Sequence, residues 1–428
     1  MPSSEPPELP ALLPLVSAPA RRYQAFVDEL YGPVRQDGTE AEVRAGYLSL
    51  LWADYILDGG STKGGQSERH AKGVDAAIQE VRHETGVCQA IRLVRDELRN
   101  STFAPNPSTL LSHLLGYASG LEEAGSYLLA ADVAESVMAR ASAIKLPGLE
   151  SKAGLVLARV LRRLGRWEDA EATCLRVERA ASLHGDGSAA LWAKISAGKV
   201  AMERGDLTLA EARFKAIHEQ AIRLNLPQLQ GMALHEMGAV YFRQNMFRQA
   251  LTVFEQALAI QPDALELSLL LIDIATASAE LGAVDLARQA NQHVANTDAN
   301  VRLLGMAYTN LVWLESLANN HIGFERNRRQ LVELPLTGES KVLALIEIAE
   351  GLTRLGKVKT ARMAYEQARE SAIAERTPHL LKRATIEDET FSDLLRKRAQ
   401  NAPEAMPPIV HRLSKRVEAL ERRRQAGC

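Results

Sequence analysis

A turn residue, either glycine or asparagine, recurs at nearly constant intervals along most of this chain of 428 residues. In the clearest copy the turn residue is Asn245, with Phe247 two positions later, Ala250 five positions later and Phe254 nine positions later. Five other segments show a similar order of residue types around their own turn residue. The six turn residues are Gly125, Gly165, Gly205, Asn245, Gly282 and Gly356. A repeat of this length predicts stacked supersecondary units rather than a single closed core.

The intervals between these turn residues are 40, 40, 40, 37 and 74 residues. Each interval except the last has room for two helices and two short turns, which need about 34–40 residues. The last interval therefore holds two repeats, and a less regular copy is expected near Asn320. Glycine or asparagine provides the left-handed backbone that ends a helix. One hairpin cannot bury its apolar face alone, so we expect the hairpins to stack on one another.

The composition agrees with an entirely helical chain. Only eight of the 17 prolines lie between residues 21 and 400, and no segment alternates convincingly between apolar and polar residues. Hydrophobic residues make up 46% and charged residues 24%, which is ordinary for a soluble globular protein. The formal net charge of −2 argues against a whole-chain binder of nucleic acid or membrane surfaces.

The repeats resemble those of the tetratricopeptide repeat family over residues 108–377. Residues 238–262 match the signature of that family at nearly every position. The period of about 36–40 residues is similar to that of bacterial regulators, such as peptide-pheromone sensors and the sensory regions of some diguanylate cyclases. The resemblance implies an all-α fold, a right-handed superhelical α-solenoid of helical hairpins. It also implies that the first helix of each hairpin lines a concave groove.

Three further segments are expected around the repeats. Residues 1–20 are rich in proline, serine and glutamate and predict a disordered tail. Residues 21–107 have helical patterning that fits the repeat poorly, which indicates an atypical helical N-terminal cap. Residues 378–428 predict a C-terminal capping helix, a linker and a basic amphipathic helix.

The last helix has an apolar row with a 3-4-3 spacing, which is typical of a short coiled-coil seam. The residues of this row are Val410, Leu413, Val417 and Leu420. Three interpretations remain open for the helix. It caps the solenoid, it forms a homodimer through these four residues, or it serves as a signalling connector or nucleic-acid-binding patch.

The resemblance also selects the residues expected in the groove, which lie 13, 10, 6, 3 and 2 positions before each turn residue. The predicted partner-binding residues are Lys152, Arg159, Arg162, Arg163, Trp192, Lys199, His235, Phe242, Arg243 and Asn310. Cations interleaved with apolar groups suit a peptide with acidic side chains or a free carboxylate. The alternative is a solvated basic face whose cations pair with acidic residues on the adjacent helix.

Motifs for catalysis and metal binding are missing from the sequence. The glycine-rich residues 58–65 lack the Gly-Lys-Ser/Thr order of a phosphate-binding loop, and they follow a helix rather than a strand. His235 and Glu236 begin like a zinc-protease motif, but Ala239 stands where the second histidine is needed. The three cysteines form no Cys-x-x-Cys pair. We therefore predict no cofactor and no metal, and an enzyme is only the third alternative.

The sequence as a whole predicts a cytoplasmic, non-enzymatic scaffold, adaptor or regulator that binds a protein or peptide. No stretch of 18 apolar residues is present, so we expect no membrane span, and nucleic acid is not an expected partner. The main alternative is a signal-sensing input module. It would bind a peptide or small molecule and act on an output through the C-terminal helix.

Overall fold

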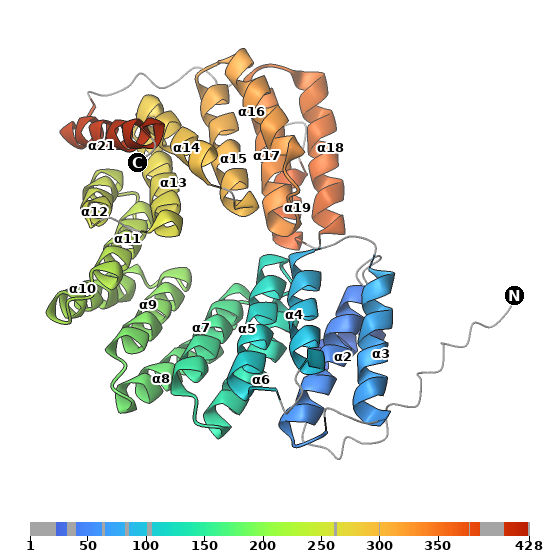
Figure 1. Cartoon of the computed structure of the whole chain (residues 1–428). Coiled ribbons are helices and arrows are strands. Elements are labelled where there is room, and N and C mark those ends of the chain that lie inside the picture. Colours follow the sequence, from blue (N-terminus) through green and yellow to red (C-terminus); the bar gives the residue numbers. More distant parts are fainter. Residues whose placement is uncertain are drawn as a thin grey trace, which may run out of the picture. The chain divides into compact units, whose positions relative to one another are not determined.

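A computed structural model describes residues 23–31, 40–61, 65–81, 85–100, 105–260, 263–298, 300–375, 377–385 and 406–426. These residues contain helices and no strand, which confirms the predicted all-α fold (Figure 1). Before the repeats lie α1 (Gln24–Tyr31), α2 (Glu40–Leu57), α3 (Gly65–Glu80) and α4 (Gly86–Asn100). The hairpin helices up to the midpoint are α5 (Pro107–Glu123), α6 (Tyr127–Ala143), α7 (Pro147–Arg163), α8 (Trp167–Leu183), α9 (Gly187–Glu203), α10 (Leu207–Arg223), α11 (Pro227–Arg243) and α12 (Phe247–Ala259). They are followed by α13 (Ala264–Glu280), α14 (Val284–Thr297), α15 (Val301–Leu317), α16 (His321–Glu333), α17 (Gly338–Arg354), α18 (Val358–Ala374), α19 (Pro378–Ala384) and α21 (Pro408–Gln425).

From α5 to α12, successive helices begin every 20 residues, and each helix up to α11 has 17 residues. One residue in each turn adopts a positive φ, which reverses the chain and ends the helix. These residues are Gly125, Lys145, Gly165, Gly185, Gly205, Asn225 and Asn245, with φ between 51° and 85°. Lys145 carries an ordinary side chain in this conformation (φ 59°), and the sequence signal at this turn is Pro147, the first residue of α7.

The period shortens to 37 residues after Asn245, because the second helices of the next three hairpins are shorter than those before them. The second helices α12, α14 and α16 have 13, 14 and 13 residues, whereas the first helices α13, α15 and α17 keep 17. The less regular copy expected near Asn320 is present, and its left-handed residue is Asn319 (φ 53°). The interval of 74 residues is therefore two periods of 37.

The chain divides into two compact units, residues 1–184 and residues 185–428. In the first unit, α2 contacts α3, α4 and α5, while α1 contacts α2 and α6. Trp52 of α2 is buried, and its indole nitrogen donates a hydrogen bond of 2.9 Å to Ser67 Oγ. The helices α1 to α4 thus share a core with the first hairpin. Residues 1–20, expected to be disordered, lie outside the described residues.

In the second unit the helices form two layers. The first helices α9, α11, α13, α15 and α17 contact one another in order, and we call them the first-helix layer. The second-helix layer consists of α10, α12, α14, α16 and α18. Close approach within a hairpin depends on glycine. A Cβ atom on Gly198 would lie 2.6 Å from the ring of Phe214, and one on Gly238 would lie 2.2 Å from the ring of Phe254.

The C-terminal part of the second unit contains α19 and α21. Leu380 and Ala384 of α19 are buried in a cluster with residues of α17 and α18. Most of the segment between α19 and α21, residues 386–405, lies outside the described residues, including most of the predicted linker. None of the described helices combines the length and the apolar character needed to cross a membrane.

Candidate partner-binding surface

The residues predicted to contact a partner lie on first helices of the hairpins. Those on α7, in the first unit, are Lys152, Arg159, Arg162 and Arg163. Those on α9, α11 and α15, in the second unit, are Trp192, Lys199, His235, Phe242, Arg243 and Asn310. The predicted set therefore divides between the two units.

In the first unit, Arg159 is engaged by an acidic residue of the neighbouring first helix. Its Nε and Nη2 donate hydrogen bonds of 2.6 and 2.7 Å to the two carboxylate oxygens of Glu122 on α5. This geometry is bidentate, which is the stronger form of an arginine–carboxylate pair. Lys152 and Arg163 are exposed on the same helix. Arg159 thus links α5 to α7 instead of offering a free cation.

In the second unit, Lys199 forms a similar link between α9 and α11. Its Nζ lies 2.6 Å from Glu236 Oε1, and the Glu236 side chain is only 9% exposed. Arg243 donates a hydrogen bond of 3.1 Å to the Met202 carbonyl, in the last turn of α9. Two of the predicted cations therefore hold the first helices together.

His235 connects α11 to α13. Its Nε2 lies 2.7 Å from Asp273 Oδ2, and the ring meets the ring of Phe254 edge-on. Burial alone would lower the pKa of His235, but the hydrogen bond and the charges of Asp273 and Glu236 outweigh it and raise the pKa. Protonated His235 is thus favoured in the folded state relative to an unfolded chain.

This contact predicts a pH-dependent stability. The raised pKa means that the contribution of protonated His235 is fully present below the unfolded pKa of about 6.5 and is lost as pH rises through the folded value. We expect the melting temperature of the wild type to exceed that of His235→Gln most at pH 6, with the difference shrinking towards pH 8.5. His321→Gln, which alters an exposed histidine of the same unit, is the control for the effect of replacing a histidine by glutamine. A difference that is independent of pH would contradict the assignment.

The two predicted aromatic residues are only partly buried and lie on neighbouring first helices. Trp192 of α9 packs at the edge of the cluster that contains Phe214 and Ile217. Phe242 of α11 packs on Phe247, with ring centroids 5.4 Å apart and a tilted geometry. Both side chains thus keep apolar surface that a ligand is able to cover.

A column of polar residues, of which the sequence prediction contained only Asn310, runs through α11, α13, α15 and α17 of the first-helix layer. Its members lie nine positions before the turn residues Asn245, Gly282, Asn319 and Gly356, and they are 37 residues apart. The column consists of Glu236, Asp273, Asn310 and Glu347. Asn310 was expected in the groove, but its amide donates a hydrogen bond of 3.2 Å to Asn291 of α14. Because the turn residue is Asn319 rather than Asn320, the positions counted 6 and 3 residues before it are Trp313 and Ser316.

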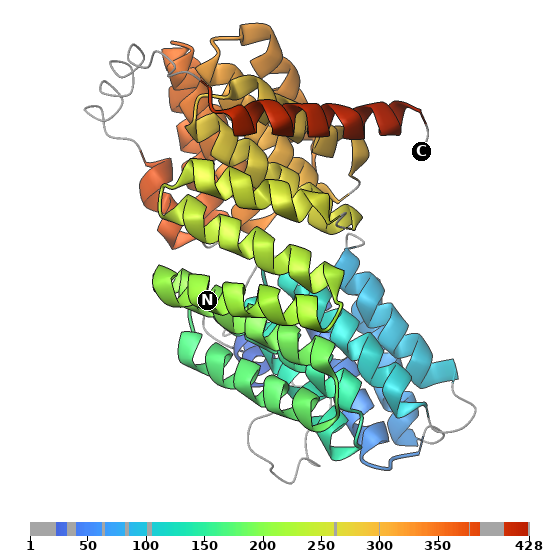
Figure 2. The same cartoon turned by 90° about the vertical axis from the view of Figure 1, so that its left-hand side faces the viewer.

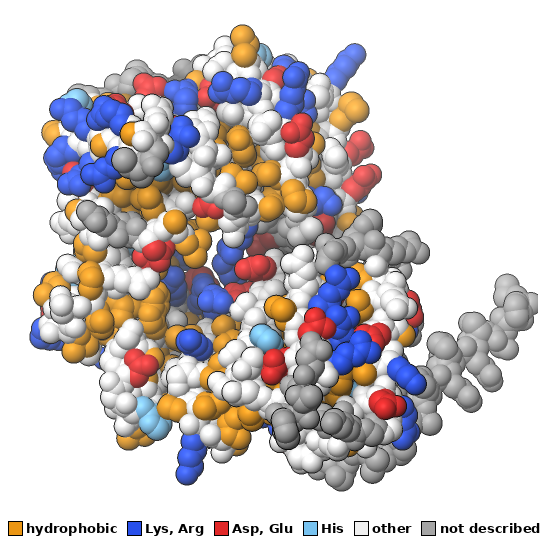
Figure 3. All heavy atoms as spheres, viewed as in Figure 1, with side chains coloured by type: hydrophobic (Ala, Val, Ile, Leu, Met, Phe, Trp, Pro, Cys, Tyr) orange, Lys and Arg blue, Asp and Glu red, His pale blue; other side chains and the backbone are white. Residues whose placement is uncertain are grey.

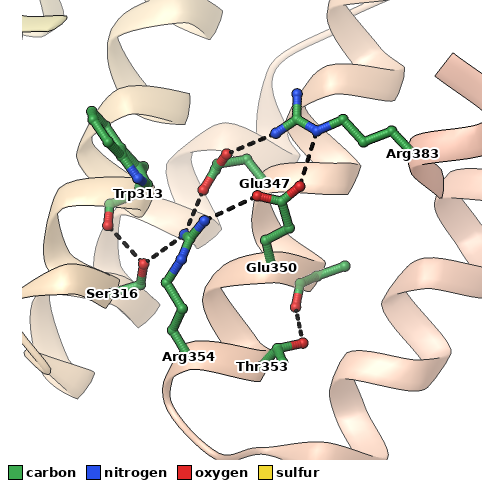
Figure 4. A network of polar contacts seen from close by, with 8 residues as sticks. Trp313, Ser316, Glu347, Glu350, Thr353, Arg354 and Arg383 are labelled. Atoms are coloured by element: carbon green, nitrogen blue, oxygen red, sulfur yellow. Dashed lines mark hydrogen bonds and ion pairs between the residues drawn. The ribbon is translucent and has the colours of Figure 1, made fainter. Parts of the chain in front are cut away.

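Ser316 belongs to a polar network that joins α15, α17 and α19 (Figure 4). Arg354 Nη1 donates to Ser316 Oγ at 3.0 Å and to Glu347 at 2.8 Å, while its Nη2 donates to Glu350 at 3.0 Å. Arg383 of α19 reaches both carboxylates, with its Nε 2.9 Å from Glu350 and its Nη2 3.5 Å from Glu347. Burial raises the pKa of Glu347 despite the nearby charge of Arg354. This network anchors α19 to α17.

The charges of the first helices are therefore largely paired with one another. Arg159, Lys199 and His235 each meet an acidic residue of an adjacent helix, as the alternative interpretation of the basic residues expects. Two of these acidic partners, Glu236 and Asp273, were not predicted, because they lie nine positions before the turn and that position was not counted. The regular 37-residue spacing of this polar column was the signal for them. The part of the chain that the structure describes contains no group of three His, Cys, Asp or Glu side chains arranged to hold a metal ion.

The predicted apolar seam of the last helix faces the chain itself. Leu413 and Val417 are buried in the main cluster of the second unit, and Val410 and Leu420 pack at its edge. The contacts of α21 are with α12 and α14. While α21 remains docked, Leu413 and Val417 are not accessible to a second copy, and Val410 and Leu420 are only partly exposed.

Comparison with known proteins identifies the repeats. Models of the tetratricopeptide repeat family match residues 190–263 and residues 152–176, and these segments lie within α9 to α13 and α7 to α8. None of the curated proteins compared with this chain matches it.

Solved structures similar to this chain include NprR in complex with its cognate peptide NprX. That likeness has 14% identity and a TM-score of 0.48, and covers 76% of this chain and 96% of that one. A Rap protein complexed with competence and sporulation factor has 11% identity and a TM-score of 0.46, covering 78% and 98%. Aspartyl phosphate phosphatase F from Bacillus subtilis has 12% identity and a TM-score of 0.46, covering 80% and 96%.

Proposed function

Because this chain is a tetratricopeptide repeat protein, we propose that it is a non-enzymatic scaffold that binds a segment of a partner protein along its first-helix layer. The observation that carries the proposal is the pair of partly exposed aromatic side chains, Trp192 and Phe242, on the neighbouring first helices α9 and α11. Exposed aromatic residues on a rigid framework are the usual anchors of peptide binding. The protein would act as an adaptor or regulator through what it holds.

The charge pairs between the first helices determine which side chains of a partner segment fit this surface. Lys199 and His235 already contact carboxylates, so an acidic ligand would have to break these pairs before it gained its own. Apolar side chains that cover Trp192 and Phe242 meet no such obstacle. We therefore propose a peptide segment with aliphatic or aromatic anchors, whose polar groups contact the exposed Arg243.

The test is a peptide selected on the immobilised full-length chain from a random library, with affinity then measured by titration calorimetry. Trp192→Ala and Phe242→Ala are each expected to weaken binding at least tenfold, or about 1.4 kcal/mol, because a partly exposed aromatic anchor is lost. Trp167→Ala is the matched control, since it removes a partly buried tryptophan from a second helix, α8. Unchanged affinity in the first two variants, with helical content retained, would overturn the proposal.

A further inference from the structure

The helix α21 lies on the second-helix layer, far along the sequence from the helices that it contacts (Figure 2). Ile409, Leu413 and Val417 point along one face at intervals of four residues, with exposures of 5%, 0% and 1%. This face bridges α12 and α14. We call the sides of α12 and α14 beneath it the α21 seat. The burial of a complete helix face shows that the seat is a site for an amphipathic helix.

Polar contacts at both edges fix the register of α21 in its seat. On α12, Glu255 accepts hydrogen bonds of 3.0 and 3.1 Å from Arg412, and its Oε1 lies 3.4 Å from Arg416 Nε. On α14, Gln289 accepts a hydrogen bond of 3.0 Å from Ser414, and His293 Nδ1 lies 3.0 Å from Glu421 Oε2. The Glu255 side chain is only 14% exposed, so an occupant of the seat has to bring a cation to it.

Capping the end of the hairpin stack does not require α21. The last hairpin, α17 and α18, is covered by α19, whose Leu380 and Ala384 are 8% and 1% exposed in the shared cluster. The helix α21 instead binds two hairpins that already have neighbours on both sides in the sequence. The helix α21 therefore does not act as the terminal cap of the hairpin stack.

The docking of α21 combines a small contact with a covalent connection. Three side chains supply most of the buried apolar face, and the two arginines at Glu255 remain about half exposed, at 53% and 47%. Residues 385–407 join the helix to α19, and this connection keeps the local concentration of α21 above that of a free helix. A weak intrinsic affinity is therefore enough to fill the seat, and a tighter helix is able to displace α21.

We propose that the α21 seat is a second partner-binding site, which takes an amphipathic helix of another protein, and that α21 is its resident, displaceable occupant. The partner helix would carry aliphatic residues at i, i+4 and i+8, and basic residues at i+3 and i+7 that reach Glu255, as Arg412 and Arg416 do. Displacement also frees a strongly basic helix. Figure 3 shows lysine and arginine side chains gathered over α21, and the exposed ones are Arg412, Lys415, Arg416, Arg422, Arg423 and Arg424.

A labelled synthetic peptide of residues 406–426 tests the seat directly, with binding followed by fluorescence anisotropy. We expect at least tenfold tighter binding to full-length Leu413→Glu/Val417→Glu, in which the resident helix is released, than to the wild type. The control variant is Lys415→Ala/Arg423→Ala, which changes exposed residues of α21 and should bind as the wild type does. A peptide that carries the Leu413→Glu and Val417→Glu changes should bind neither protein. If the released variant keeps its helical content and binds no more tightly than the wild type, the proposal is wrong.

A second measurement keeps the proposal testable if the released variant folds poorly. Excess peptide added to the wild type should speed hydrogen exchange of the α21 amides and leave the α19 amides unchanged, while light scattering shows a constant mass. Unchanged exchange in α21 at saturating peptide would mean that the resident helix cannot be displaced. A doubling of mass with concentration would mean that a second copy supplies the occupant, and either result would overturn the proposal.

Discussion

Replacing Phe254 with alanine is expected to lower the free energy of unfolding of the second unit by about 3–5 kcal/mol. The ring is fully buried on α12, where it lies against the backbone of Gly238 and the ring of His235. Alanine would lose the apolar contact and leave a cavity, because the two helices are already in close contact and have little room to collapse. Guanidinium denaturation followed by circular dichroism measures the effect.

The control for this substitution is Ile322→Ala on α16. Ile322 is 85% exposed, so removing its side chain should change the free energy of unfolding by less than about 0.5 kcal/mol. Similar losses in the two variants would show that the packing between Gly238 and Phe254 is not a main source of stability. The chain would then depend on helix formation more than on contacts between helices.

Arg288→Met is expected to cost a similar amount, about 3–5 kcal/mol, for an electrostatic reason. Arg288 of α14 donates a hydrogen bond of 2.8 Å to Glu315 of α15, whose side chain is only 1% exposed. Asn320 donates a second hydrogen bond of 2.7 Å to the same carboxylate. Removing the arginine leaves a buried charge with one neutral donor, which is much less favourable than the pair.

A double-mutant cycle separates this effect from lost packing. Arg288→Met/Glu315→Gln keeps the shape of the site and removes the buried charge, so it should recover more than half of the loss. The measurement is again the midpoint of guanidinium denaturation, at pH 7. A double variant as unstable as Arg288→Met alone would show that the cost comes from the arginine stem and not from the unpaired carboxylate.

The helices were predictable because turn residues and apolar spacing are local signals. Asn245 and the glycines at the other turns end helices through their own backbone preference, and this is visible in one sequence. Lys145 adopts the same left-handed conformation without that preference (φ 59°). The local signal at this turn is instead Pro147, two residues later, which begins the helix α7 that packs on α6.

The charge pairs of the candidate surface were harder to predict, because they depend on how neighbouring helices face each other. Lys199 was expected in the groove, but its partner Glu236 lies on a face of α11 that the counting excluded. Asn310 was assigned from a turn placed one residue too late. One residue rotates a helix by about 100°, so that error moved the predicted position to another face.

The amphipathic pattern of α21 predicted an apolar face, but it did not predict which surface covers that face. The sequence spacing of Val410, Leu413, Val417 and Leu420 is equally compatible with a second copy and with the chain itself. Contacts between distant parts of the chain distinguish the two, such as the hydrogen bond from Arg412 to Glu255, which lies 157 residues earlier. Contacts over such a separation leave no periodic signal in a single sequence.

The packing of α21 on α12 and α14, which come much earlier in the sequence, affects how the chain folds. Hairpins that contact only their neighbours are able to fold in sequence as they are made, whereas the contacts of α21 with α12 and α14 span 125 to 157 residues. During synthesis α12 and α14 leave the ribosome long before α21, and their seat stays uncovered in that interval. The entropic cost of closing so long a loop grows only with the logarithm of its length, so the delay is mainly kinetic. The nascent chain therefore passes through a period in which an apolar strip in its middle is open to any helix that arrives first.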